Sequence, residues 1–190
     1  MENYKLKIIK HRHNFIPNFD MKFGLEIDIR DYNGILVLSH DLPNEKCLSF
    51  EKFLESVNPN TMLLINVKST DIQQNLQEIL TKYKIENYFT FDWAVPDLLK
   101  AVKNNLICAF RVSEYEKEII PGCAWVWVDS FDSIWYDEKY LRNLKTTGLK
   151  IALASPELHN RDSELERIRK IIKNIDVDVI CTDVPEFWVK

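Results

Sequence analysis

The stretch Leu25-Glu26-Ile27-Asp28-Ile29 alternates apolar residues with carboxylates, and the fold of the whole chain is best understood from it. Side chains of a β-strand point alternately to its two faces, so Glu26 and Asp28 share one face. Two neighbouring carboxylates repel each other unless a cation or a proton lies between them. This strand is therefore either a sheet edge with a polar face in water or a wall of a cation site.

Histidines lie on both sides of this strand in the sequence. Downstream, Asn33-Gly34 predicts a tight turn into a second strand at 35–39, and His40-Asp41 follows that strand. Upstream, His11-Arg12 follows another short apolar run. Carboxylate oxygens suit a hard divalent cation such as Mg²⁺ or Ca²⁺. Two histidines beside such an ion would supply the base and the acid that phosphodiester cleavage requires.

Short apolar runs recur along the rest of the chain and alternate with helical patterns. The predicted strands are 6–9, 25–29, 62–67, 88–91, 106–110, 124–128, 149–154 and 177–181. The predicted helices are 49–57, 71–83, 96–103, 137–145 and 163–174. Alternation of this kind predicts βα units with parallel strands, and eight such units close into a barrel.

The predicted fold is thus an α/β protein, a compact (β/α)₈ TIM barrel forming a single domain over residues 1–190. Such barrels typically need about 250 residues, so the loops must be short. The segment 14–23 is too short and broken for a full first helix, which predicts a shortened first helix or loop. A doubly wound open sheet is the alternative, but no G-x-G-x-x-G follows a strand.

Polar residues stand at the end of successive predicted strands, where a barrel carries its active face. Lys68 follows Asn66 by two residues, so both should share a face and Lys68 would contact a phosphate or neighbour the metal. His13 and His159 are expected at the surface. The other polar residues at strand ends are Asp92, Arg111, Asp129, Ser155 and Asp183.

Composition excludes several classes of function. The formal net charge of −4 and the absence of a basic stripe argue against a nucleic-acid partner. No apolar run reaches the ~20 residues needed to span a bilayer, and residues 1–5 lack the apolar core of a secretory signal. We therefore expect a cytoplasmic protein, with a mature form that has lost its signal as the alternative. The four cysteines form no C-x-x-C pair and are expected to be reduced thiols, two of them in apolar runs.

The ordered motifs resemble those of the glycerophosphodiester phosphodiesterases, metal-dependent barrels related in fold to the phosphatidylinositol-specific phospholipases C. His11-Arg12-His13 stands where that family has H-R-G, and Glu26-Ile27-Asp28 stands at its E-x-D step. His40-Asp41 matches the H-D that ends its hairpin. Asn66-Val67-Lys68 corresponds to E-x-K, and Thr182-Asp183-Val184-Pro185 corresponds to T-D-x-P.

This resemblance implies a role for each matched residue. His11 and His40 would be the acid–base pair, while Arg12 and Lys68 would bind the phosphate. One divalent metal ion, Mg²⁺ or Ca²⁺ with Mn²⁺ as a further option, would be held by Glu26, Asp28 and Asn66. The substrate would be a small glycerophosphodiester, or a related phosphodiester with a neighbouring hydroxyl, which attacks the phosphorus before water opens a cyclic intermediate. The cellular setting would be lipid metabolism.

Two departures from the family keep other interpretations open. Asn66 replaces a metal-binding glutamate, and the segment after His13 is cut short. A phosphate-ligand-binding barrel with altered catalysis is therefore one alternative. A different TIM-barrel enzyme that uses Lys68 to form a Schiff base is another. The sequence leaves the oligomeric state open.

Overall fold

The computed structural model describes residues 6–17 and 22–189. The expectation about a secretory signal concerns residues 1–5, and part of the shortened segment 14–23 is residues 18–21; both lie outside the described residues. The strands are β1 (Lys7–Lys10), β2 (Gly24–Tyr32), β3 (Ile35–Leu38), β4 (Leu48–Ser49), β5 (Leu63–Val67), β6 (Tyr88–Phe91), β7 (Ala109–Val112), β8 (Trp125–Val128), β9 (Lys150–Ala154) and β10 (Val179–Thr182).

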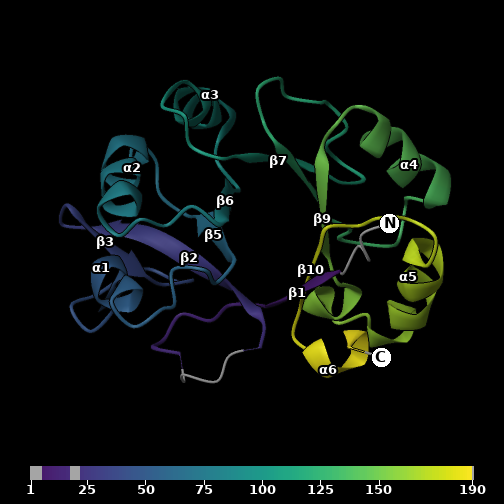
Figure 1. The fold of residues 1–190 in the computed structure, drawn as a ribbon, viewed down its shortest axis with the longest axis horizontal. Helices are drawn as coiled ribbons and strands as arrows, with labels where there is room; N and C mark the ends of the chain where they lie inside the picture. Colours follow the sequence, from purple (N-terminus) through teal and green to yellow (C-terminus); the bar gives the residue numbers. More distant parts are fainter. Residues whose placement is uncertain (1–5, 18–21, 190) are drawn as a thin grey trace.

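Helices lie around the outside of these strands (Figure 1). The α-helices are α1 (Phe50–Leu54), α2 (Gln73–Lys82), α3 (Val95–Lys103), α4 (Glu138–Thr146), α5 (Leu165–Ile172) and α6 (Pro185–Trp188), and two 3₁₀ helices are η1 (Pro156–His159) and η2 (Asp162–Glu164). Side-chain caps fix where two of them begin. Ser49 accepts from the N–H of Lys52 at 3.3 Å before α1, and Asp137 accepts from the N–H of Tyr140 at 2.8 Å before α4.

Eight of the strands run parallel, as the alternating pattern predicts. Parallel ladders join β6 to β5, β5 to β2, β2 to β1, β1 to β10, β10 to β9, β9 to β8 and β8 to β7. Between β6 and β7 there is one parallel bridge, Thr90 to Cys108, with the N–H of Thr90 donating to Ile107 O at 2.8 Å. The fold is mixed α/β. Among the described residues, this bridge is the sole strand-type link between β6 and β7, which are the two ends of the series of parallel strands.

The described residues also show where the βα pattern is incomplete. No helix separates β7 from β8, and residues 11–17 and 22–23 contain none between β1 and β2. The hairpin is as predicted: Asn33 and Gly34 both have positive φ, 53° and 82°, which suits the two-residue turn joining β2 to antiparallel β3.

Alternating side chains of the parallel strands separate into two apolar clusters. Odd-numbered β2 residues such as Leu25 and Ile27 pack toward the helices with the larger core. The other face, which we call the inner face, carries a second cluster made of Ile9, Met62, Leu64, Phe89, Phe91, Ala109, Trp125, Trp127, Ala152, Ala154, Val179 and Cys181. Large rings on β6 and β8 are accommodated by alanines on β7 and β9, so the inner face is filled by side chains.

Small residues allow the first strands to approach closely. A methyl group on Gly24 would lie 2.4 Å from Ile9 Cδ1 and 2.8 Å from Met62 O.

All four cysteines are free thiols, as expected. No helix within residues 6–17 and 22–189 is long and apolar enough to cross a membrane.

Candidate active site at the strand ends

Polar residues continue the inner face beyond the apolar cluster, at the C-terminal ends of the strands. His11 follows Ile9 by two residues, Asn66 follows Leu64, and Asp183 follows Cys181, so strand alternation places all three on the inner side. Glu26 and Asp28 lie on the same face and are each only 1 % exposed. The carboxylates of β2 are thus buried, and the sheet-edge interpretation of this strand is wrong.

A pocket of about 320 Å³ opens at these strand ends and brings the predicted site together. Every predicted site residue except Asp28 lines it, and Asp28 reaches it through Lys68, whose Nζ lies 3.7 Å from Asp28 Oδ1. A larger hollow, of about 610 Å³, lies against α2 and contains none of these residues. The pocket lining is His11, Arg12, Glu26, His40, Asn66, Lys68, Phe91, Asp92, Arg111, Trp127, Asp129, Phe131, Ala154, Leu158 and His159.

His11 is held by the carboxylate of Asp183, the residue that follows the neighbouring strand β10. Its Nδ1 lies 3.1 Å from Asp183 Oδ1, and its Nε2 lies 4.0 Å from Glu26 Oε2. Burial lowers the pKa of His11, and the charge of Asp183 and its hydrogen bond offset part of that shift. Asp183 is itself positioned by Glu157, which accepts from the N–H of Asp183 at 3.0 Å. The imidazole is therefore kept neutral near pH 7 with Nε2 turned toward Glu26.

His40 has the same kind of partner at the same ring nitrogen. Its Nδ1 lies 3.2 Å from Asp41 Oδ1, so Nε2 is the nitrogen left for a substrate. Arg30 fixes the backbone of His40, because its Nη2 donates to His40 O at 2.9 Å. Both histidines thus line one pocket with a carboxylate at Nδ1, the arrangement that a pair of proton-transfer groups requires.

Glu26 is a buried carboxylate that lacks a full set of partners. Its Oε2 accepts from the N–H of Arg12 at 2.6 Å, while its Oε1 has no hydrogen-bond partner. Arg12 adopts a positive φ of 49° to make this contact, a backbone conformation that costs about 1–3 kcal/mol in a residue other than glycine. Burial, and then the charge of Asp28, raises the pKa of Glu26 to about 8.

Asp28, by contrast, is well supplied with donors. Its Oδ2 accepts from Asn14 Nδ2 at 2.9 Å and lies 3.9 Å from Arg12 Nε. Lys68 extends the chain of charges, because its Nζ lies 3.7 Å from both Asp28 Oδ1 and Asp92 Oδ2. Arg12 and Lys68 therefore flank the carboxylates at the pocket and supply positive charge there.

The donor atoms at this site suit a hard divalent cation. Glu26 Oε1 and Asn66 Oδ1 come from neighbouring strands, are both buried, and both lack a hydrogen-bond partner. A buried carboxyl group with a raised pKa and an orphaned amide oxygen favour a bound cation over an empty, dry site. In the described part of the chain no three His, Cys, Asp or Glu side chains form a metal cluster, so the amide of Asn66 would have to contribute.

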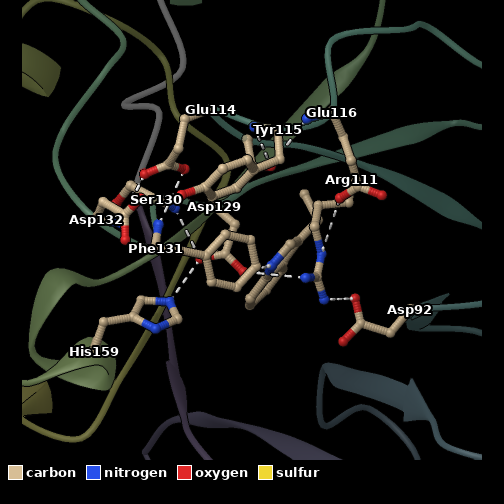
Figure 2. Close-up of polar contacts among 12 residues, drawn as sticks. Asp92, Arg111, Glu114, Tyr115, Glu116, Asp129, Ser130, Phe131, Asp132 and His159 are labelled. Atoms are coloured by element: carbon tan, nitrogen blue, oxygen red, sulfur yellow. Dashed lines mark hydrogen bonds and ion pairs between the residues drawn. The ribbon is translucent and has the colours of Figure 1, made fainter.

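The opposite side of the pocket contains Asp92, Arg111 and Asp129, which the sequence places at strand ends, together with His159, which it did not reveal. Arg111 forms an ion pair with Asp92, and His159 Nε2 lies 2.8 Å from Asp129 Oδ1 (Figure 2). His159 was expected at the surface, but its side chain is only 26 % exposed and lines the pocket. It ends η1, directly after β9, and β9 neighbours β8, which ends before Asp129. The adjacency of those two strand ends is the signal that could have found this pair.

His13, the other histidine expected at the surface, is 3 % exposed. Its ring packs against Phe15 with 3.8 Å between centroids, and its N–H donates to Glu26 O at 2.7 Å. The motif resemblance would place a glycine at this position, whereas this chain has a buried ring. His13 therefore supports the backbone of β2 at Glu26 and does not line the pocket.

Comparison with solved structures identifies the fold. A glycerophosphodiester phosphodiesterase from Thermotoga maritima aligns with a TM-score of 0.73 and 16 % identity over 97 % of each chain. A glycerophosphodiester phosphodiesterase from Agrobacterium tumefaciens aligns with a TM-score of 0.68 and 14 % identity over 97 % of this chain and 99 % of that one. A phosphodiesterase from Oleispira antarctica, solved with the product sn-glycerol-3-phosphate, aligns with a TM-score of 0.67 and 14 % identity over 95 % of this chain and 94 % of that one.

Neither a protein-family model nor a curated protein sequence matches this chain. The similarity is therefore one of three-dimensional structure, and it covers nearly the whole length of this chain and of each aligned structure. It confirms the resemblance that the ordered histidine and E-x-D motifs indicated: this chain has the fold of the glycerophosphodiester phosphodiesterases.

Proposed function

We propose that this chain is a phosphoric diester hydrolase that acts on a glycerophosphodiester, or on a related diester with a hydroxyl next to the phosphate. We also infer that its eight parallel strands form a closed (β/α)₈ barrel, with the Thr90–Cys108 bridge as the closing contact. The structures it resembles are phosphodiesterases, which supports the reaction class.

One observation carries the proposal: two histidines, each with a carboxylate at Nδ1, line the same pocket as a buried carboxylate with a partnerless oxygen. His11 and His40 provide a base and an acid, and Lys68 and Arg12 provide positive charge at the same place. A structural role explains none of this well, because a buried, partnerless carboxylate oxygen costs stability.

We propose one divalent metal ion as cofactor, Mg²⁺ or Ca²⁺ with Mn²⁺ as a further option, held by Glu26, Asp28 and Asn66. When bound, the ion would offset the negative charge that grows on the phosphoryl oxygens. Lys68 and Arg12 add to that electrostatic stabilisation from the protein itself. Asn66 in place of a carboxylate removes one negative charge, so the affinity for the cation should be modest.

The histidines perform the proton transfers. In the first step one imidazole takes the proton of the neighbouring hydroxyl as its oxygen bonds to phosphorus, and the other gives a proton to the departing alcohol oxygen. In the second step the two reverse their roles while water opens the cyclic diester. Each ring has a carboxylate at Nδ1, from Asp183 in one case and Asp41 in the other. That carboxylate keeps a proton on Nδ1 and leaves Nε2 to exchange protons with the substrate.

Hydrolysis of glycerophosphocholine in Mg²⁺, Mn²⁺ or Ca²⁺, with EDTA as the metal-free condition, tests this proposal. We expect metal-dependent release of choline, and loss of turnover by about 10²–10⁴-fold in both His11→Ala and His40→Ala. Lys82→Ala, which removes an exposed ion pair with Glu51 on α2, is the matched control and should keep full activity. Equal turnover of all three variants and the wild type would contradict the proposal.

A phosphate-ligand-binding protein is the second candidate, and Asn66 is the observation that favours it. With only two carboxylates at the site, the cation could be too weakly held for turnover. This candidate predicts no hydrolysis of any diester, together with a rise in melting temperature on adding sn-glycerol-3-phosphate. Asn66→Glu would then create metal-dependent turnover, whereas under the first proposal it changes only the metal concentration required.

A Schiff-base enzyme that uses Lys68 fits the geometry less well. Lys68 Nζ lies 3.7 Å from each of two carboxylate oxygens, of Asp28 and Asp92, so its nitrogen is engaged in charge pairing. Borohydride trapping of an adduct on Lys68 would revive this interpretation.

A further inference from the structure

The pocket has a second half that the proton-transfer scheme does not use. It is built on Asp129, which follows β8, and on His159, which ends η1 (Figure 2). Both line the pocket that also contains His11 and His40. Among the described residues, neither forms a hydrogen bond or ion pair with those two histidines, so a separate task must account for them.

The Asp129 carboxylate is a hydrogen-bond acceptor that its neighbours hold in place. It is 5 % exposed, accepts from Trp127 Nε1 at 3.1 Å and from the N–H of Ser130 at 2.9 Å, and lies 2.8 Å from His159 Nε2. Burial opposes its ionisation, but hydrogen bonding to His159 and the charge of Arg111 outweigh burial and lower the pKa of Asp129. Because Nε2 is bound to Asp129, the Nδ1 of His159 is the ring nitrogen left for a ligand.

Arg111 adds donors without adding net positive charge. Besides its ion pair with Asp92, it lies 4.0 Å from Asp129 Oδ2 and 3.9 Å from Glu116 Oε2. A guanidinium surrounded by three carboxylates is a poor site for an anion. What this half offers instead is a set of fixed donors and acceptors side by side, which suits the hydroxyl groups of a neutral ligand.

An aromatic wall completes this half of the pocket. The ring of Phe131 lies 5.2 Å from that of His159, edge to face, and the Arg111 guanidinium carbon lies 5.2 Å from the Phe131 centroid (Figure 2). The Glu114 carboxylate fixes this loop by accepting from the N–H groups of Phe131 at 3.1 Å and Asp132 at 2.8 Å. Polar groups beside an apolar ring match a ligand that has hydroxyls at its edge and C–H groups on its face.

The two halves meet at Asp92. Its Oδ2 lies 3.7 Å from Lys68 Nζ on the phosphate side, and its Oδ1 pairs with Arg111 on the other side. Asp92 has a positive φ of 63°, in the left-handed region, and its carboxylate lies between the two cations. A diester whose phosphate contacts Lys68 would therefore extend its second alcohol toward Arg111 and His159.

We propose that Arg111, Asp129 and His159 form a binding subsite for the second alcohol of the diester, and that this alcohol is polyhydroxylated, such as a sugar or a cyclitol. This inference rests on the proposed phosphodiesterase function and names the part of the substrate that the function leaves open. His159 and Asp129 bind hydroxyls in this scheme and transfer no proton.

The ratio of kcat/KM for glycerophosphoinositol to kcat/KM for glycerophosphoethanol, whose second alcohol has no free hydroxyl, tests the subsite. We expect the wild type to favour glycerophosphoinositol, and His159→Ala and Asp129→Asn to reduce that ratio about ten- to a hundred-fold, chiefly through KM. His40→Gln is the matched control: it should slow both substrates and preserve the ratio. A ratio unchanged by His159→Ala, or a wild-type preference for glycerophosphocholine, would overturn the proposal.

Binding of free myo-inositol, measured by calorimetry, separates failure of the subsite from failure of the catalytic proposal. If no diester is hydrolysed, the phosphodiesterase proposal fails by itself. Binding of myo-inositol that is weakened at least tenfold by His159→Ala would still support the subsite. Absence of binding to the folded wild-type protein, or equal binding to the variant, would refute it.

Discussion

Arg30 fixes the backbone of His40: its Nε and Nη2 donate to the carbonyl oxygen of His40 at 3.2 and 2.9 Å. Its Nη1 donates to the carbonyl oxygen of Lys68 at 3.1 Å. One guanidinium on β2 thus joins the loop that carries His40 to the strand end that carries Lys68. The planar fork of arginine makes all three contacts at once, which a lysine is unable to do.

We predict that Arg30→Lys lowers kcat about ten- to a hundred-fold, because a loosened loop misplaces His40 relative to the phosphate. KM should change little, since Arg30 does not line the pocket. Arg142→Lys is the control, because Arg142 makes a similar pair of contacts with Glu138 on the exposed face of α4. If kcat is unchanged in Arg30→Lys, the carbonyl clamp has no role in positioning His40.

Asp183→Asn should shift the pH dependence of turnover. Asp183 raises the pKa of His11 against the lowering caused by burial, so its loss lowers that pKa further. The limb of the kcat/KM profile that His11 governs should therefore move to lower pH, with a reduced plateau because the ring loses its orienting partner. The measurement is kcat/KM from pH 5 to 9. A limb that moves to higher pH would show that Asp183 does not act on His11 in this way.

Stability of the metal-free protein should depend on Glu26. Its pKa rises from an ordinary value of 4.5 to about 8 in the folded state, so the unfolded chain ionises first as pH increases. The free energy of unfolding in EDTA should consequently fall between those two pH values, by a few kcal/mol, and then level off. Urea denaturation at pH 5 and pH 8.5 measures this. Glu26→Gln should lose the slope, and an equal slope in the variant would contradict the assignment.

Gly24→Ala should destabilise the fold by about 1–3 kcal/mol, because the added methyl group meets Ile9 Cδ1 and Met62 O. Thermal denaturation of Gly24→Ala, Ile9→Val and the double variant forms a double-mutant cycle. Ile9→Val removes the nearest atom, so the double variant should be more stable than the sum of the single effects predicts. Strict additivity would show that the clash is relieved elsewhere.

Much of the fold could be predicted from local pattern. Alternation in 25–29 and the other short apolar runs predicted eight strands that overlap the eight parallel strands, and the Asn33-Gly34 turn predicted the hairpin. The short strand β4 and the helix α6 were missed, since two and four residues carry too little periodicity to detect. The segment between β7 and β8 crosses without a helix, in agreement with the sequence, which showed no helical pattern between residues 110 and 124.

The site could be predicted only where one strand or one motif carries it. Glu26 and Asp28 share a face by strand period alone, whereas the Arg30 clamp joins residues far apart in the chain through backbone carbonyls that no sequence pattern reports. His159 was misjudged for the same reason, since its partner Asp129 belongs to a different strand end. The predictions of a single domain, a cytoplasmic location and no nucleic-acid partner stay predictions.

The central claim is that two histidines at one pocket transfer protons in metal-dependent diester cleavage. Its most direct test is turnover of glycerophosphocholine by the wild type, His11→Ala and His40→Ala, each with saturating Mg²⁺, Mn²⁺ or Ca²⁺ and with EDTA. We predict turnover by the wild type with metal, its loss in EDTA, and a reduction of about 10²–10⁴-fold in both variants. Turnover that survives EDTA, or that survives both substitutions in the folded protein, would contradict the account.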